Sequence, residues 1–246
     1  MVPLTDVAEW IRESRKIVGF TGAGISTNSG IPDFRSPGGV WAKNKTIMFQ
    51  DFVDNYEDRV TYWQQKAAIW PDMRDASPNN AHLFFAELDR AGNLMGLITQ
   101  NIDGLHERSG VDMEKIVRLH GWMGEAVCLS CGAGISMDEA CDRVRHEPAP
   151  VCDQCGGLLK PATISFGQRL RESDLNRAAA LSAKCDLFIV VGSSLVVQPA
   201  AGFPEIAKKN KARLVIVNNA ATPLDSLADA VIREDIGVAF ERLMAS

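Results

Sequence analysis

Hydrophobic residues along this chain gather in short continuous runs that each end in small or polar residues. The runs span residues 16–24, 94–101, 186–194 and 213–219. Continuous apolar runs of this length are typical of strands that are covered on both faces. We therefore expect these segments to be strands of a parallel sheet.

Between these runs, polar and apolar positions follow a helical period instead. Residues 6–14 and 199–209 have the pattern of helices, and another helix opens at Pro78 behind an asparagine cap. Residues 31–75 carry scattered aromatic side chains in a partly helical pattern. Strands that alternate with helices predict the α/β class, with a parallel sheet and helices on both of its faces.

Composition and charge restrict the class of protein further. The 246 residues are 46% hydrophobic and 23% charged, which is ordinary for a globular chain. The net charge of −5 argues against a protein that coats nucleic acid, so we expect no direct nucleic-acid binding. Residues 1–16 lack the apolar core of a signal peptide, and the longest apolar stretches, such as residues 187–191, are too short to span a bilayer. We expect a soluble, cytoplasmic protein with no membrane partner.

One stretch, residues 128–155, is rich in cysteine, glycine and charge and predicts a small inserted module. Two Cys-x2-Cys pairs, separated by 20 residues, have the spacing of two thiolate pairs that close one tetrahedral Zn²⁺ site. The four predicted ligands are Cys128, Cys131, Cys152 and Cys155. Four thiolates leave no open position for water, so the zinc is expected to be structural, one ion per chain. The alternative is four unrelated buried thiols, and we expect Cys141 and Cys185 to be packing residues.

A glycine-containing segment, residues 22–30, follows the first predicted strand. Its glycines are expected to leave backbone N–H groups free to approach a pyrophosphate near a helix N-terminus, although a plain structural turn would look similar. Two later strands end in residues 192–194 and 218–219. The carboxyl ends of parallel strands are where such folds bind ligands, so these segments favour a common site.

Residues 99–106 place amide and carboxylate groups directly after another strand, where they point at a ligand or cap a helix. His120 precedes the cysteine module, in a loop that would reach back toward the sheet, and is either a structural residue or a general base. We expect His82 to be packed in a helix, and His106 and His146 to be exposed.

Three segments together strongly resemble the sirtuins, namely residues 22–36, 99–106 and 119–121. The resemblance also includes the cysteine quartet, Phe166-Gly167, residues 192–200 and Val217-Asn218, and it runs from about Lys16 to Phe240. It implies an NAD-dependent protein-lysine deacetylase or deacylase, which acts on acyl-lysine protein substrates. NAD would be a co-substrate, consumed to give nicotinamide, O-acyl-ADP-ribose and free lysine.

The resemblance also implies the domain organisation. Residues 1–246 would form a single catalytic region with a Rossmann-type, NAD-binding large domain built from residues 14–120 and 160–246. The zinc module would span residues 122–158 and be joined by a helical part within residues 36–78. The substrate peptide would lie in the cleft between the two domains.

Site roles follow from the same resemblance, position by position. The catalytic residues would be His120, as general base on the ribose hydroxyls, and Asn101. NAD would contact Gly22, Ala23, Gly24, Ser26, Asp33, Phe34, Arg35, Gln100, Asp103, Gly192, Ser193, Ser194, Asn218 and Ile236. The substrate would contact Ile102, Ile164, Phe166, Gly167 and Val196.

Two departures from the family pattern bear on the substrate. Ser165 stands where many members have an aromatic residue, and Gln168 stands where they have an acid, which affects peptide preference. Members that prefer succinyl or malonyl lysine carry Tyr-x-x-Arg in the helix that lines the acyl pocket, where this chain has Trp63 and Lys66. Tyr56 and Arg59 have that spacing but lie a few residues too early, so we expect acetyl or other uncharged acyl groups.

Other functions remain open at this point. A protein mono-ADP-ribosyltransferase would use the same NAD site. A zinc-ribbon module that senses NAD or binds nucleic acid would need no catalytic His120. Ordinary dehydrogenase chemistry is the least favoured reading.

Overall fold

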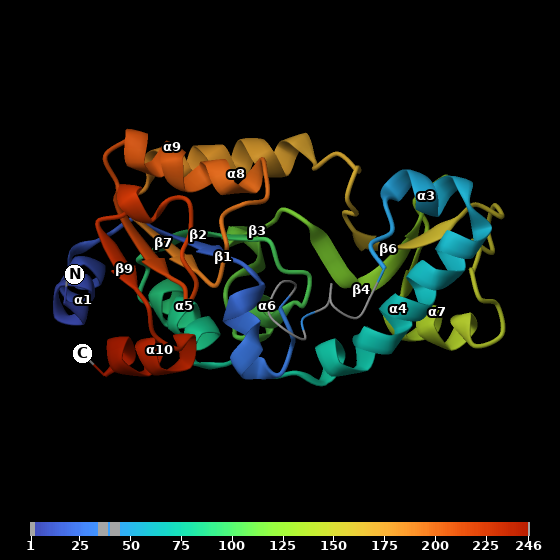
Figure 1. Ribbon diagram of the computed structural model, residues 1–246, viewed down its shortest axis with the longest axis horizontal. Coiled ribbons are helices and arrows are strands. Elements are labelled where there is room, and N and C mark those ends of the chain that lie inside the picture. The colour runs from blue at the N-terminus through green and yellow to red at the C-terminus, as the bar shows by residue number, and fades with distance from the viewer. Residues whose placement is uncertain (1–2, 34–38, 40–44, 246) are drawn as a thin grey trace.

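The computed structural model describes residues 3–33, 39 and 45–245. Two lobes lie side by side, a large one around a six-stranded sheet and a small one around a three-stranded sheet (Figure 1). The chain begins and ends in the large lobe. It therefore crosses to the small lobe and returns.

The large lobe is built on a parallel sheet with strand order β3-β2-β1-β7-β8-β9. Its strands are β1 Ile17–Thr21, β2 Leu94–Thr99, β3 Ile116–Arg118, β7 Leu187–Val191, β8 Arg213–Val217 and β9 Ala230–Ile232. Every residue of β1 and β7 is buried, as expected for continuous apolar runs. The predicted Rossmann-type sheet is confirmed.

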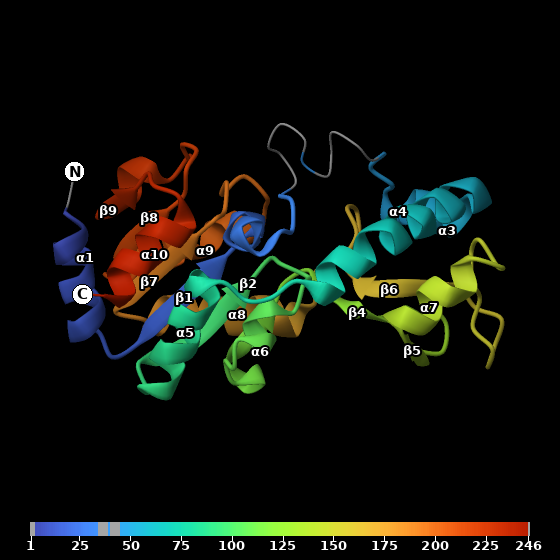
Figure 2. The same cartoon turned by 90° about the horizontal axis from the view of Figure 1, so that it is seen from below.

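Helices cover both faces of this sheet (Figures 1 and 2). One face packs against α1 Leu4–Glu13, α5 Asn80–Arg90 and α10 Ile236–Met244. The opposite face packs against α8 Glu172–Lys184 and α9 Phe203–Lys209. Short helices connect these elements: η1 Ala23–Ser29, α6 Leu105–Arg108, η2 Met113–Lys115, η3 Ala200–Gly202 and η4 Asp225–Leu227. The helix expected over residues 199–209 thus begins with the 3-10 turn η3.

The small lobe combines two separate stretches of chain. Its antiparallel sheet has the order β5-β4-β6, with β4 Gly121–Cys128, β5 Gly134–Ser136 and β6 Leu159–Thr163. Its helices are α3 Phe49–Asp54, α4 Tyr56–Asp75 and α7 Met137–Val144. One apolar cluster joins both stretches, with Phe52 and Trp63 from the first and Met123 and Met137 from the second. The helical pattern of residues 31–75 therefore belongs largely to the small lobe.

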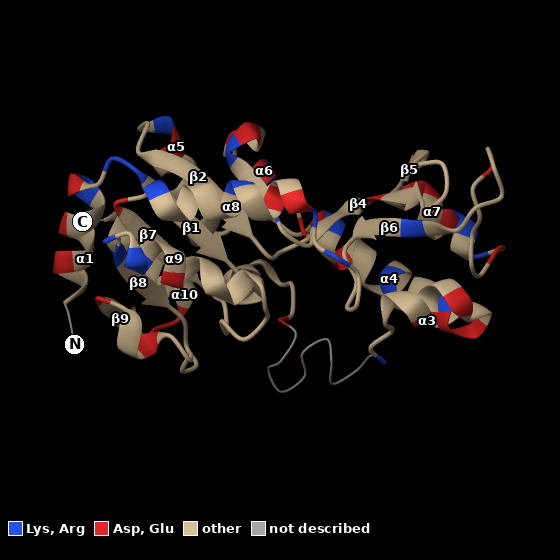
Figure 3. Cartoon of the chain, turned by 90° about the horizontal axis from the view of Figure 1, so that it is seen from above, with Lys and Arg blue, Asp and Glu red and all other residues tan. Residues whose placement is uncertain are grey.

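Within the part of the chain that the structure describes, no helix combines the length and the apolar character that crossing a bilayer requires. Positively and negatively charged residues are interspersed along the ribbon of both lobes in Figure 3.

Candidate active site

The predicted ligand-binding segments follow strands on both sides of the point where the strand order of the large sheet reverses. Gly22 follows β1, Gln100 follows β2, Gly192 follows β7 and Asn218 follows β8. The strand order runs outward from β1 to β3 on one side and from β7 to β9 on the other. This reversal between β1 and β7 is where doubly wound sheets open a crevice for ligands.

Glycines let the loops after β1 and β7 touch through their backbones. A Cβ atom on Gly24 would lie 2.8 Å from Cα of Gly192, and one on Gly22 would lie 2.8 Å from the Gly192 carbonyl oxygen. Gly192 itself has a φ of +64°, and a Cβ there would lie 2.2 Å from the Ile25 nitrogen. No larger residue fits at these positions without moving a loop.

The role expected for the glycine N–H groups is wrong in one respect. The Gly22 N–H donates to the Val191 carbonyl at 3.0 Å, and the Gly24 N–H donates to the Gly192 carbonyl at 2.9 Å. These two donors are used to join the loops and are not free for a pyrophosphate. The glycines serve close approach of the backbones instead.

Three buried side chains form a polar cluster beneath these loops. The Asn101 amide donates to the Gly22 carbonyl at 3.2 Å and to Ser26 Oγ at 3.1 Å. Ser26 Oγ donates to Asp103 Oδ2 at 2.8 Å, while Asp103 Oδ1 accepts the Leu105 N–H at 2.9 Å. Asp103 therefore accepts the N–H of Leu105, the first residue of α6, although the N-cap of this helix is Gly104. A contact of Asp103 with a ligand stays a prediction. Burial raises the pKa of Asp103.

Gln100 and Ser193 connect the ends of β2 and β7. Gln100 Nε2 donates to Ser193 Oγ at 2.8 Å, and the Gln100 N–H donates to the Thr21 carbonyl at 2.9 Å. Since both amide hydrogens of Asn101 are also used, the Asn101 amide oxygen is the group left for a ligand. The cluster thus leaves the Asn101 amide oxygen available to a ligand and fixes its orientation.

His120 is held in one tautomer. Its Nδ1 lies 3.0 Å from the Gln100 carbonyl oxygen, and because a carbonyl only accepts, Nδ1 carries the hydrogen. Burial lowers the pKa of His120, although the bond to Gln100 opposes that effect, so the ring is neutral near pH 7. Nε2 then has a free lone pair and can accept a proton, as a general base must.

Some of the residues expected to contact NAD are neither polar nor exposed. The Asn218 side chain donates to the Ala220 carbonyl at 2.7 Å, and Ser194 is half-buried next to Ser193. Ile236 opens α10 and is buried in the core of the large lobe. Asp33 is half-buried. Phe34 and Arg35, also expected to contact NAD, lie outside the described residues.

The predicted substrate residues lie in the segments that follow β2, β6 and β7. Phe166 and Val196 are 45% and 51% exposed, whereas Ile102 and Ile164 are half-buried. The Ile164 N–H donates to the His120 carbonyl at 2.8 Å, which ties this segment to the candidate base. Gly167 has a φ of +82°, so a turn follows Phe166 directly.

The α4 helix does not present the residues that the sequence alignment placed at the acyl pocket. Trp63 is fully buried in the small-lobe core. Tyr62, one residue earlier, directs its hydroxyl toward Thr163 Oγ1 and Ser165 Oγ, at 3.3 and 3.2 Å. Lys66 Nζ lies 5.2 Å from the centroid of the Tyr62 ring. Sequence reasoning missed Tyr62, for which the polar Ser165 opposite it was the available signal.

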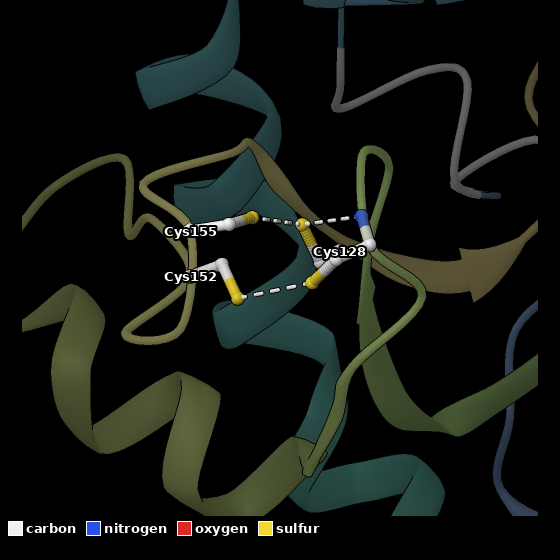
Figure 4. Close-up of side chains that lie close together, drawn as sticks. Cys128, Cys152 and Cys155 are labelled. Atoms are coloured by element: carbon white, nitrogen blue, oxygen red, sulfur yellow. Dashed lines mark hydrogen bonds between the residues drawn. The ribbon is translucent and has the colours of Figure 1, made fainter.

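The four cysteines predicted to bind zinc converge at the end of the small lobe, where Figure 4 labels Cys128, Cys152 and Cys155. All four Sγ atoms lie within 4.8 Å of one another. The pairs Cys128–Cys155 and Cys131–Cys152 have Sγ–Sγ distances of 3.5 and 3.6 Å. Tetrahedral ligation at a Zn–S distance of about 2.3 Å requires about 3.8 Å between sulfurs, so the cluster fits this ion.

The local backbone also favours the thiolate form that zinc binds. The N–H groups of Cys131 and Ser130 point at Cys128 Sγ and lower the pKa of this thiol to about 6. Cys141 and Cys185 lie outside the cluster, Cys185 buried in the large lobe, in agreement with packing roles.

One histidine prediction is wrong. His106 is 1% exposed, not on the surface, because its ring turns inward from α6 and contacts Thr21 Oγ1 at 3.0 Å. A helix of four residues gives too short a pattern for the sequence to reveal its buried face. His82 is buried and His146 is exposed, as expected.

Comparisons with known proteins place this arrangement among a single group. A family model described as the Sir2 family matches residues 22–199. NAD-dependent protein deacetylase 1 of Bradyrhizobium diazoefficiens is 49% identical over 231 residues, covering 94% of this chain and 91% of that protein. NAD-dependent protein deacylase 1 of Archaeoglobus fulgidus is 38% identical over 234 residues, covering 95% of this chain and 94% of that protein. A solved structure of Sir2 with a p53 peptide and NAD+ gives a TM-score of 0.90 at 37% identity, covering 99% of this chain and 98% of that chain.

Proposed function

Since this chain belongs to the Sir2 family, we infer that the polar groups at its strand ends hold NAD and that His120 is the general base. The chain is an NAD-dependent protein deacetylase or deacylase, and its products are nicotinamide, O-acyl-ADP-ribose and free lysine. The observation that carries the assignment of His120 is its fixed tautomer, which leaves Nε2 unprotonated while Nδ1 bonds the carbonyl of Gln100, the residue before Asn101.

Different residues of the large lobe have different roles in the proposed reaction. Bound NAD supplies an electrophilic ribose carbon, from which nicotinamide departs and to which the acyl-lysine oxygen adds. His120 Nε2 takes a proton from a ribose hydroxyl, and the Nδ1–H bond to the Gln100 carbonyl stabilises the resulting cation. The Asn101 amide oxygen, whose orientation Ser26 and Gly22 fix, would be the acceptor offered to the ribose.

Zinc has a structural role in this scheme. The quartet of cysteines uses every tetrahedral position, so the ion activates no water. We infer that it fixes the module of residues 122–158, which joins the helical part within residues 36–78 as the small domain beside the NAD-binding domain of residues 14–120 and 160–246.

The substrate is an acyl-lysine protein segment that lies between the lobes. We propose that Ile102, Ile164, Phe166, Gly167 and Val196 line it, because Ile164 bonds the His120 carbonyl and the side chains of Phe166 and Val196 are exposed. We also propose a preference for uncharged acyl groups. Arg59, which has the spacing for a carboxylate partner, instead donates to the carbonyls of Phe52 and Val53 at the end of α3, at 3.0 and 2.8 Å.

The alternative reactions have less support. The matching relatives are named deacetylases or deacylases, which favours acyl transfer over ADP-ribosyl transfer. We propose a cytoplasmic location, since a reducing compartment keeps the four zinc thiolates available, and no direct nucleic-acid binding, in line with the net charge of −5.

Peptide-dependent release of nicotinamide tests the function and the base together. With NAD and an acetyl-lysine peptide, the protein should release nicotinamide, and His120→Ala should lower kcat by about 10²–10⁴-fold. His146→Ala, which changes an exposed histidine, is the matched control and should keep wild-type turnover. Full activity of His120→Ala would contradict the assignment of the base.

Acetyl and succinyl versions of one peptide test the acyl preference separately. We expect the acetyl peptide to have the higher kcat/KM. Faster turnover of the succinyl peptide would overturn the proposed preference and would implicate Lys66 as its cationic partner.

A further inference from the structure

Two histidines that the proposed reaction does not use lie behind the NAD site. His82 on α5 and His106 on α6 are 0% and 1% exposed, and the centroids of their rings are 4.9 Å apart. Two ionisable rings in such a place are costly unless their nitrogens have defined partners. The hydrogen bonds around them fix which nitrogens carry hydrogen.

His106 is linked to the segment that carries Asn101. Its Nε2 lies 3.0 Å from Thr21 Oγ1, which donates to Thr99 Oγ1 at 2.9 Å. Thr99 Oγ1 also accepts the Asn101 N–H at 3.0 Å. Because the Thr21 hydroxyl hydrogen points to Thr99, His106 must donate from Nε2, and its Nδ1 is then a bare acceptor.

His82 is linked to the helix that carries Ser26. The Asn79 N–H donates to His82 Nδ1 at 3.3 Å, so the neutral ring carries its hydrogen on Nε2. The Asn79 side chain in turn donates to the Ile25 carbonyl at 2.8 Å and to Ser29 Oγ at 2.9 Å, both on η1.

Two ring nitrogens remain after these bonds are assigned. His82 Nε2 and His106 Nδ1 are buried and have no hydrogen-bond partner among the described residues. One is a donor and the other an acceptor, and they belong to rings in contact. Their hydrogen-bonding needs are therefore complementary.

We propose that His82 and His106 are positioning residues of the NAD site, a neutral, proton-ordered pair that holds η1 and the segment after β2 in register. This inference rests on the proposed function, because η1 carries Ser26 and the segment carries Asn101. The pair acts through Asn79 on one side and through Thr21 and Thr99 on the other. Neither ring touches a reacting atom.

The electrostatics of the two rings agree with a neutral pair. Burial, with a smaller effect of Arg108, lowers the pKa of His82 to about 3. Burial also lowers the pKa of His106 well below its ordinary value, and His82 adds to the effect. Both rings are therefore expected to stay uncharged near neutral pH.

Matched substitutions at His106 test the proposal. Glutamine can place an amide N–H where Nε2 was and keep the bond to Thr21, whereas asparagine reaches only the Nδ1 position. We expect His106→Asn to weaken NAD binding and lower kcat/KM for NAD by about 10- to 100-fold, because a small misplacement of positioned groups is costly. His106→Gln should recover most of this loss, and KM for the peptide should change little in either variant. His146→Gln, at an exposed histidine, is the control for the substitution itself.

A second measurement does not depend on turnover. Nitrogen NMR of the imidazoles in the wild-type protein should show both rings neutral, each with its hydrogen on Nε2. In a double-mutant cycle, His82→Gln, which reaches the Nε2 position and loses the Nδ1 acceptor for the Asn79 N–H, should add little to the loss in NAD affinity caused by His106→Asn, since the two rings act as one unit.

Three outcomes would overturn the inference while the deacylase function stands. They are a charged ring at neutral pH, equal NAD affinity for the asparagine and glutamine variants, and fully additive losses in the cycle. Failure of the proposed function would look different, because the wild-type protein would then release no nicotinamide with an acetyl-lysine peptide.

Discussion

The two lobes of this protein are stabilised by different interactions. In the large lobe, strands such as β7 are buried along their whole length, and apolar clusters fill both faces of the sheet. In the small lobe, the sheet has three strands, of which β5 has three residues, and the cysteine cluster joins the hairpin after β4 to the loop before β6. The large lobe depends on area removed from water alone, whereas the small lobe adds to its own apolar cluster four sulfur atoms placed to bind an ion.

This difference predicts that one lobe can unfold while the other stays folded. Loss of one apolar contact weakens the large sheet by a few kcal/mol, but loss of a ligand removes the whole contribution of the metal. His120 lies between β3 of the large lobe and β4 of the small lobe. Unfolding of either lobe should therefore lower the activity.

Removal of zinc should have the largest effect. Cys152→Ser, or chelation of the wild-type protein, should unfold the small lobe, because structural zinc contributes about 10 kcal/mol or more in comparable small sites. Hydrogen exchange should then be fast in β4, β5 and β6 and remain slow in β1 and β7, with deacylase activity lost.

Cys141→Ser is the matched control for this experiment. Cys141 lies in the small lobe but outside the ligand cluster, so its variant should keep zinc and activity. Slow exchange in β4 after complete chelation would show that apolar packing alone closes the small lobe.

Phe188→Ala should affect the large lobe next most strongly. Phe188, the second residue of β7, is 0% exposed and packs on Phe20, with ring centroids 6.0 Å apart. Its truncation should lower the free energy of unfolding by about 3–5 kcal/mol, measured by urea denaturation, with zinc content unchanged. Met113→Ala, at a side chain 65% exposed, should have almost no effect. Loss of zinc from Phe188→Ala would mean that the lobes do not fail separately.

Gly124→Ala should destabilise the small lobe by about 1–3 kcal/mol, because the new Cβ overpacks the site. That atom would lie 2.1 Å from the Trp122 ring, which lies across Gly124. Gly134→Ala on β5 is the control, since its Cβ would meet its nearest neighbour at 3.8 Å. Thermal unfolding and tryptophan fluorescence report the change, and Trp122→Ala should relieve it. An equal loss in both glycine variants would point to backbone entropy instead.

The smallest effect concerns the ionisation of Tyr62. Although burial alone opposes it, the ammonium groups of Lys66 and Lys160 lower the pKa of Tyr62 to about 8, against 10.0 for the ordinary side chain. The folded protein thus loses this proton at lower pH than the unfolded chain. The stability contributed by the ionisation is fully present above pH 10 and is lost as pH falls through about 8.

Ultraviolet absorbance of tyrosinate measures this ionisation directly. The chain has 2 tyrosines, and Tyr62→Phe should remove the step near pH 8 while Tyr56→Phe leaves it. A step that persists in Tyr62→Phe would show that the lysines near Tyr62 do not set it.

The features that could be predicted from the sequence are those encoded locally. Strands such as β7 were recognisable because both faces are buried and the apolar run is continuous. The zinc ligands were recognisable because the two cysteines of each pair have two residues between them, the spacing at which two such pairs bind one ion. The segment around His120 was recognisable through its resemblance to a family, and its role remains a prediction.

The features that could not be predicted depend on contacts between distant segments. Lys160 is 1% exposed and lies 5.6 Å from the Tyr62 ring, with its ammonium group bonded to the carbonyls of Pro161 and Thr163. Lysine is rarely buried, so no local pattern suggests this. The inward turn of His106 and the use of the Gly22 N–H by Val191 likewise arise only when α6, β1 and β7 come together.

The division of the small lobe into two stretches has a consequence for protein synthesis. Helices α3 and α4 are the first elements of the small lobe to leave the ribosome. They remain without the rest of this lobe while α5, β2 and β3 of the large lobe are synthesised. The small lobe has all its strands once β6 has emerged, at Thr163, whereas β1 gains its second neighbour only with β7, at Leu187. During that interval β1, a central strand of the finished sheet, has an open edge on the nascent chain. The lobe that needs a metal can thus be complete before the lobe that needs none.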